Sequence, residues 1–244
     1  MKKLVKKMHK KIFITFCFIG FSMLYGQKSK TTFGLQYKPM IPIKVLNVED
    51  ILINDEGFDA TISPVLGHNF GAIIRWGFTD KIAFESGLSY VRRNFNLDVT
   101  LDDSLSGSLQ YGVVNYEIPF QGLFYVRLNK RFYMNAATGV SLNFRASDVG
   151  NFTDNRKFSQ ITLVQYINLA YIANIGFEYR SKKSGTFYLG ASLSTPFRPL
   201  GKTTIYSEDL VNVKKISATL IGNYLSVDLR YFFKDSKKRK PTVQ

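Results

Sequence analysis

The feature that most constrains the fold is a regular alternation of apolar and polar residues between positions 113 and 144. Apolar residues recur at every second position on both sides of a two-residue break, Asn129-Lys130. Because side chains on a strand alternate faces, this pattern predicts two strands, each with one apolar and one polar face, joined as a hairpin. The strands are longer than the roughly five or six residues usual in soluble proteins. Such lengths are typical of strands that cross a bilayer at a tilt, with the apolar face toward lipid.

The same alternation recurs along the chain and predicts an all-β fold, an eight-stranded antiparallel transmembrane β-barrel. The expected strands are residues 31–38, 69–78, 82–98, 113–128, 132–144, 161–180, 187–194 and 217–233. Their connections alternate between long and short, as in bacterial barrels with long external loops and short periplasmic turns. The long connections, expected as loops, are residues 41–66, 102–108, 146–158 and 197–216. A soluble β-sandwich is the alternative, and the strand lengths and outward aromatic residues disfavour it.

The ends of the chain predict export. Residues 1–26 combine six lysines with an apolar run and end at a small residue, the pattern of a secretory signal peptide cleaved after Gly26. Removal of this segment lowers the net charge from +15 to +9. Residues 27–233 are then the barrel, and residues 234–244 are a basic periplasmic tail. The expected location is the bacterial outer membrane, so we expect the positive charge to face lipid or cell wall and not nucleic acid.

A set of charged residues falls on the inward face of the predicted strands, near the short turns. Charges removed from water are costly unless they are paired, so opposite signs at one level predict a salt-bridge network and no open pore. A gated path for protons or ions is the alternative. The predicted network comprises Arg75, Glu85, Arg127, Glu178, Arg180, Asp228 and Arg230, with Lys38, Glu117 and Gln121 further along the interior.

Candidate catalytic chemistry is sparse. Residues 27–244 hold one histidine, His68, and no cysteine, so no zinc site of the His/Cys type and no cofactor is expected. His68 lies near a predicted loop that carries acidic residues, and such a partner could help it to activate a hydroxyl group. A solvated histidine at a loop end is the simpler interpretation.

Two stretches resemble a known family. Tyr116, Ile118, Pro119 and Phe120, followed by Ala136, Gly139 and Leu142, are similar to paired strand motifs of the PorT-type outer-membrane β-barrel family. The resemblance implies a barrel with an accessory role in type IX secretion or gliding motility. A second resemblance concerns the C-terminal strand, which is similar to the signal read by the barrel-assembly machinery. It comprises Gly222, Leu229, Tyr231 and Phe233, but eleven residues follow the final Phe.

Together these features predict a non-catalytic outer-membrane protein with a structural, transport-associated or secretion-accessory role. One alternative is an enzyme that modifies lipid A or cleaves protein, using His68. Another is a protein whose surface loops bind a ligand or partner, since function concentrates on loops carried by a rigid scaffold. The expected partners are outer-membrane lipid and lipopolysaccharide, the barrel-assembly machinery and components of a secretion machine.

Overall fold

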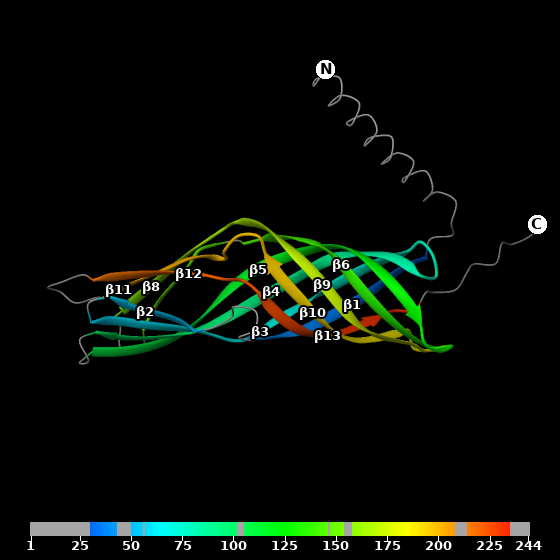
Figure 1. The fold of residues 1–244 in the computed structure, drawn as a ribbon, viewed down its shortest axis with the longest axis horizontal. Coiled ribbons are helices and arrows are strands. Elements are labelled where there is room, and N and C mark those ends of the chain that lie inside the picture. Colours follow the sequence, from blue (N-terminus) through cyan, green and yellow to red (C-terminus); the bar gives the residue numbers. More distant parts are fainter. Residues whose placement is uncertain are drawn as a thin grey trace, which may run out of the picture.

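The computed structural model describes residues 30–42, 50–55, 57–101, 105–145, 147–153, 158–207 and 214–234. The predicted signal peptide, and the predicted tail beyond Lys234, lie outside these residues. The described chain forms antiparallel β-structure (Figure 1). Its strands are β1 (Lys30–Ile41), β2 (Ile51–Asp55), β3 (Phe58–Gly77), β4 (Ile82–Leu101), β5 (Leu105–Arg127), β6 (Phe132–Phe144), β7 (Val149–Phe152), β8 (Phe158–Val164), β9 (Ile167–Arg180), β10 (Thr186–Pro196), β11 (Gly201–Ser207), β12 (Lys215–Leu220) and β13 (Tyr224–Phe232).

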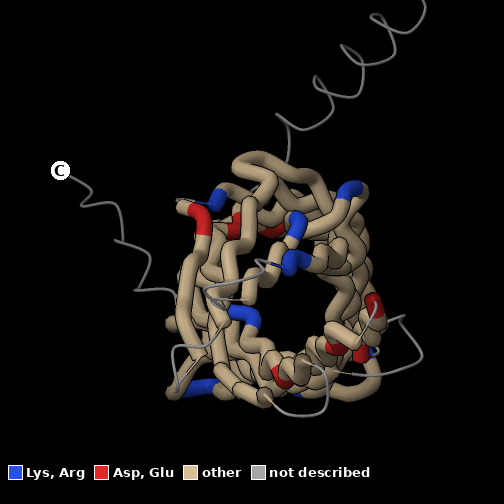
Figure 2. The backbone as a smooth tube through the Cα atoms, turned by 90° about the vertical axis from the view of Figure 1, so that its left-hand side faces the viewer, with Lys and Arg blue, Asp and Glu red and all other residues tan. Residues whose placement is uncertain are grey.

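Eight strands close into a ring, which we call the barrel. The order is β1-β3-β4-β5-β6-β9-β10-β13, and β13 pairs back onto β1, with Leu35 opposite Tyr231. Figure 2 looks along the ring from the end that lies on the left in Figure 1. Three short turns (residues 78–81, 128–131 and 181–185) lie at one end, which we call the turn end. The predicted fold class and the predicted short turns are confirmed.

At the other end the strands continue into a second body, which we call the extension. It combines β2, β7, β8, β11 and β12 with the adjoining parts of β3, β4 and β5 (residues 58–65, 94–101 and 105–113). In Figure 1 the extension is the left-hand part. The prediction that these four connections are loops is therefore wrong, because each of them includes residues that belong to a strand. Residues 165–166 and 221–223 divide the predicted sixth and eighth strands at the border between the two parts.

A β-bulge in β3 explains why the sequence pattern seemed to end there. The pairing with β4 shifts between Val65 and His68, so that β3 carries one extra residue. Inward positions are even-numbered before the bulge, as at Ile62, and odd-numbered after it, as at Asn69. A single alternation therefore does not fit β3 as a whole.

The apolar face and the polar face of β4 change sides along the strand. Near the turn end Phe84 and Leu88 point outward while Glu85 and Ser89 are buried inside. Beyond Arg93 the same inward face carries apolar residues and the outward face carries polar ones. The inward residues are Phe95, Leu97, Val99 and Leu101, and the outward ones are Asn94, Asn96, Asp98 and Thr100.

These inward residues of β4 belong to an apolar core that fills the extension. Phe58 and Ile62 of β3 meet Leu200, Ile205 and Leu220 from the opposite sheet, and all of them are almost fully buried. The stacked rings of Phe58 and Phe158, with centroids 5.9 Å apart, join the two sheets. The extension therefore folds like a soluble β-protein, with its hydrophobic side chains inside.

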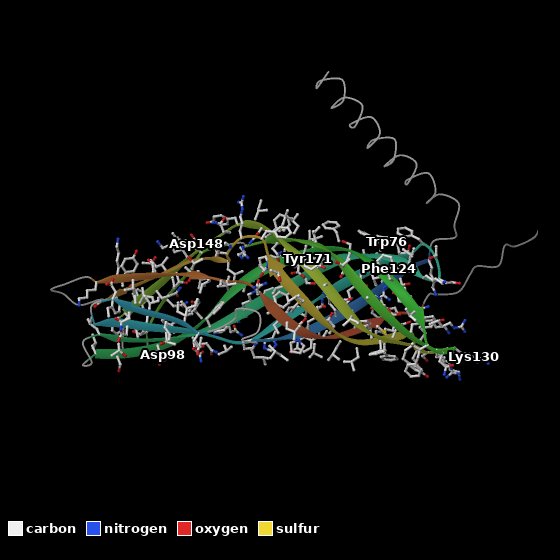
Figure 3. All side chains as sticks on the ribbon, in the orientation of Figure 1. Trp76, Asp98, Phe124, Lys130, Asp148 and Tyr171 are labelled. Carbon is white, nitrogen blue, oxygen red and sulfur yellow. The ribbon has the colours of Figure 1, made fainter. Side chains whose placement is uncertain are left out.

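The barrel exterior is an apolar surface ringed by aromatic residues. Its side chains, among them Leu35, Leu88 and Phe124, are about half exposed because they project outward. Near the turn end, rings pair across neighbouring strands: Phe132 with Tyr179 at 5.0 Å and Phe187 with Tyr231 at 5.1 Å. Trp76 and Phe124 lie in this part of the molecule (Figure 3). Such a band with an aromatic girdle is what a bilayer-spanning barrel presents to lipid.

Among the residues that the structure describes, none belongs to a helix long and apolar enough to cross a membrane.

Candidate functional site

The barrel interior is occupied by a charge network built around three buried carboxylates. Glu178 on β9 is the first of them. It accepts hydrogen bonds from Arg75 Nη1 at 2.5 Å, Tyr125 Oη at 3.2 Å and Asn135 Nδ2 at 3.0 Å. Arg180 lies 3.3 Å away on its other oxygen. With four donors, this fully buried carboxylate has no capacity left for a ligand.

Glu85 on β4 is the second carboxylate, and it joins an arginine of the neighbouring strand β3 to an arginine of β13. Arg75 donates through Nε at 3.0 Å and Nη2 at 2.9 Å, a two-pronged contact. Arg230 donates to the other oxygen at 2.6 Å, and Gln121 lies 3.3 Å from that oxygen. This pairing ties β3, β4, β5 and β13 together across the lumen.

Asp228 on β13 is the third carboxylate. Arg230 Nη2 and Ser192 Oγ each donate to it at 2.5 Å, and Ser226 Oγ donates at 2.9 Å. Lys38 Nζ lies 3.4 Å away and adds a second cation. At least one cation lies against each of the three carboxylates. These ion pairs offset the free-energy cost of removing the charges from water.

The structure brings together six of the seven residues of the predicted network, with Lys38 and Gln121 beside them. Arg127 is the exception, and its assignment to the interior is wrong. It is the last residue of β5, its side chain is exposed, and Nε donates to the Asn129 backbone oxygen at 3.3 Å. Inward parity alone does not bury a side chain that lies beyond the rim.

Arginine stacking packs the network against aromatic rings. The Arg75 guanidinium lies 3.7 Å from the centre of the Phe232 ring, and that of Arg180 lies 3.8 Å from the Tyr133 ring. A cavity of about 450 Å³ opens at the turn end, and its lining includes Arg75, Tyr125 and Glu178. The network thus occupies the lumen immediately beyond this mouth.

A second polar layer separates the charge network from the apolar core of the extension. Arg93 Nη1 donates to Asn115 Oδ1, and Asn115 Nδ2 donates to Asn143 Oδ1 at 2.8 Å. The Arg93 guanidinium also lies 4.9 Å from the centre of the Tyr224 ring, and Tyr224 donates to Glu117 at 3.3 Å. Sequence reasoning placed Glu117 in the interior but did not group it with these partners. The groups come from four different strands, β4, β5, β6 and β13, and only the register aligns them.

His68 lies on the outer surface, on the same side of β3 as Phe70. Tyr37 stacks against it with ring centroids 6.0 Å apart, and Tyr37 Oη lies 2.8 Å from His68 Nδ1. Asp59, an acidic residue of the predicted loop at residues 41–66, is nine residues away along β3, or about 30 Å at the rise of a strand. The structure does not bring His68 and Asp59 together.

The residues of the predicted assembly signal are divided between two positions. Leu229 and Tyr231 point outward from β13, and Phe233 follows directly after it with an exposed ring. Gly222 lies between β12 and β13, where a Cβ atom would come within 2.6 Å of Leu200 Cδ2. A side chain at this position would therefore have to displace the buried Leu200 side chain at the border of the extension.

Neither metal binding nor titration of the barrel gives a further site. Within the described ranges no group of three His, Cys, Asp or Glu side chains is placed to hold a metal ion. In the extension, burial raises the pKa of Tyr111 above its ordinary value. A neutral phenol therefore belongs to the apolar core.

Comparison with known proteins gives structural matches alone. No protein-family model matches the chain, and a search of curated proteins finds no match. The PorT resemblance therefore stays a prediction. The outer membrane protein OprG from Pseudomonas aeruginosa matches with a TM-score of 0.56 at 17% identity, over 86% of this chain and 99% of that one.

An outer membrane channel from Pseudomonas putida F1 also matches, with a TM-score of 0.23 at 11% identity, over 83% of this chain and 94% of that one. That similarity is too low to carry an argument. The likeness to OprG is one of fold. The chain has the fold of an outer-membrane β-barrel protein.

Proposed function

We propose that this protein is a non-catalytic protein of the bacterial outer membrane. In this proposal the barrel is a closed anchor that holds the extension at the cell surface, in a structural or secretion-accessory role. The observation that carries the proposal is the filling of the interior from the inner end of the cavity at the turn end through to the extension. Ion pairs occupy the barrel, a polar layer follows, and an apolar core occupies the extension. A ring of eight strands leaves room for little more than side chains.

Conductance measurements test the closed anchor. Purified protein in planar bilayers should give no stable porin-sized current, because passage of water would require the separation of several buried ion pairs. Glu85→Gln should not create a large conductance, since Arg75, Arg230 and Gln121 still fill the space. Stable porin-sized currents from the unaltered protein would contradict the proposal, and small proton-selective currents abolished by Glu85→Gln would favour the gated path.

The orientation of the anchor is tested by labelling intact cells. Short turns face the periplasm in known bacterial barrels, so the turn end should be hidden and the extension accessible. A tag inserted at Asn151, in the extension, should be labelled from outside, whereas a tag at Lys182, in a short turn, should not. The opposite result would require the extension to lie in the periplasm.

The proposed partners follow from the same orientation. The apolar belt would contact outer-membrane lipid and lipopolysaccharide, and β13 would present its outward residues to the barrel-assembly machinery. Components of a secretion machine are the expected partners of an accessory protein. Affinity purification from cross-linked cells tests this role, and it is rejected if such components are recovered equally well with an unrelated barrel of similar abundance.

The enzymatic alternative centred on His68 receives no support from its surroundings. Its imidazole packs on Tyr37 at the outer surface, and Asp59 is far along the strand. Comparison of lipid A from cells carrying the unaltered protein and the His68→Ala variant should show no difference. Loss of a lipid A modification in the variant would revive the alternative.

A further inference from the structure

A groove on the outer face of the extension is not used by the proposed anchor. It encloses about 510 Å³. Asp98, which lines it, lies far from Lys130 at the turn end (Figure 3). The lining residues are Asn96, Asp98, Ser108, Leu109, Gln110, Asn151 and Phe152.

The register of β4 and β5 builds one wall of this groove. Asn96 lies opposite Gln110, and Asp98 lies opposite Ser108, so four polar side chains form two adjacent cross-strand pairs. Residues two apart on a strand share a face, and here that face is outward. Leu109 points the other way and is buried in the apolar core, which fixes the strands beneath the groove. The wall is therefore a rigid surface and not a flexible loop.

The short strand β7 supplies the other wall. It belongs to the sheet of β8, β11 and β12, and it packs beside β5 without pairing with it. Phe152, at the end of β7, leaves 63% of its surface exposed. The exposed ring gives the groove an apolar surface beside its polar wall.

The polar side chains of the groove are available for a ligand. Within the part of the chain that the structure describes, the side chains of Asn96, Asp98, Ser108, Gln110 and Asn151 make no hydrogen bond or ion pair. Their neighbour Asn94 differs, since its Nδ2 donates to the Leu66 backbone oxygen at 2.8 Å and its Oδ1 accepts from Arg92. Along the outward face of β4, the groove thus begins directly after Asn94, the last of the described residues on that face whose side chain is hydrogen-bonded within the protein.

We propose that this groove binds a neutral carbohydrate. Amide side chains offer one donor and one acceptor group side by side, and a carboxylate accepts two hydroxyl hydrogens, which together match adjacent hydroxyl groups of a sugar ring. The exposed face of Phe152, with its negative π-cloud, suits the C–H-rich face of a pyranose. Concave sites with a few converging polar groups are typical of small-ligand binding.

Charge selects among the possible ligands. The lining contains the carboxylate of Asp98 and neither lysine nor arginine. A phosphate or sulfate group would meet a negative charge with no cation to offset it. The groove should therefore prefer neutral glycans to phosphorylated or sulfated ones.

The test uses the purified full chain in detergent and a panel of neutral oligosaccharides of glucose, galactose, mannose and N-acetylglucosamine. Binding is measured by calorimetry or by ligand-observed NMR up to millimolar concentrations. At least one member should bind saturably, and Phe152→Ala and Asp98→Ala should each weaken it about tenfold or more. Leu52→Ala is the matched control, because Leu52 is an apolar residue of the extension with 77% exposure that does not line the groove.

A second series offers the polysaccharide released from lipopolysaccharide, so that a glycan of the cell envelope is told apart from a free sugar. Either source supports the proposal if Phe152→Ala and Asp98→Ala weaken binding while Leu52→Ala does not. The proposal is overturned if neither series binds saturably, if all variants bind alike, or if sulfated analogues bind more tightly than neutral ones.

Discussion

The barrel and the extension share three continuous strands, β3, β4 and β5, but they enclose opposite contents. In the barrel these strands direct apolar side chains outward and surround the pairs that Glu85 and Glu178 form with arginine. In the extension they direct polar side chains outward and surround Phe58, Ile62 and Leu97. Alternation therefore specifies a strand in both parts, while the surrounding medium decides which face is inside. Lipid favours apolar side chains on the exterior of the barrel, and water favours polar ones on the extension.

The largest effect is expected from a charge placed in the apolar core. Leu97 is fully buried among apolar residues of the extension. Leu97→Asp should cost more than about 5 kcal/mol, enough to unfold the extension, because nothing there pairs with the carboxylate. Limited proteolysis in detergent should then degrade the extension while the barrel stays resistant.

The control for this change is Thr100→Asp, on the outward face of the same strand, which should leave the protease pattern unaltered. If Leu97→Asp also made the barrel sensitive to protease, the two parts would form one cooperative unit and the comparison would fail.

The second effect concerns the barrel interior, where the loss of a charge is harmful. Glu178→Gln leaves Arg75 and Arg180 short of a partner, so the free energy of unfolding should fall by about 3–5 kcal/mol. Thermal or urea denaturation in detergent measures the change. Asp80→Asn, which neutralises an exposed carboxylate in a nearby turn, should alter stability by less than about 0.5 kcal/mol. Equal effects for the two variants would show that the network does not stabilise the barrel.

The third prediction compares the cost of an arginine on the outer face of the barrel with its cost on the outer face of the extension. Leu88 and Thr100 both point outward from β4, at the barrel and the extension respectively. In lipid vesicles, Leu88→Arg should cost about 2–4 kcal/mol if Leu88 lies near the middle of the bilayer. Thr100→Arg should cost less than about 0.5 kcal/mol, since water already surrounds that position. Denaturant titration in vesicles gives both numbers, and similar costs would mean that lipid does not end between the two residues.

The smallest effect is a pH dependence inside the extension. Burial raises the pKa of Tyr111 in the folded protein, whereas in the unfolded chain its phenol ionises near about 10. The neutral phenol therefore contributes stability that is fully present below that pH and decreases as the pH rises above it. The stability difference between the unaltered protein and Tyr111→Phe should be constant up to about pH 9 and decrease at higher pH. A constant difference up to the most alkaline pH measured would place the hydroxyl group in water.

The barrel could be predicted from the sequence because lipid-facing residues form long, uninterrupted alternations. Tyr116, Ile118 and Phe120 on β5 show this pattern clearly, and the strands from residue 113 to residue 144 match it closely. The charge network followed from parity and from distance to the turns. Arg127 was the exception because counting does not show where the rim of the barrel lies.

The extension was missed although part of its signal is present. Residues 96–101 alternate as regularly as the barrel strands, but in the opposite sense, with Leu97 and Val99 inward. A search for one sense of alternation therefore ends where the medium changes. The bulge between Val65 and His68 hid the remaining pattern in β3, because a change of parity cannot be located without the partner strand. The groove at Asp98 depends on how β7 packs beside β5, which no local pattern encodes.

The change in polarity of the two faces along β4 also helps to fix the register between this strand and its neighbours. A purely alternating strand cannot distinguish its correct register from one displaced by two residues, since both keep every side chain on its proper side. Here Phe95 lies opposite Tyr111, and Ser89 lies opposite Glu117. A two-residue displacement of β4 toward the turn end would carry Phe95 into the polar layer, and a displacement the other way would carry Arg93 into the apolar core. The change of medium thus acts as a reference mark for the alignment of neighbouring strands, which a barrel of uniform strands would lack.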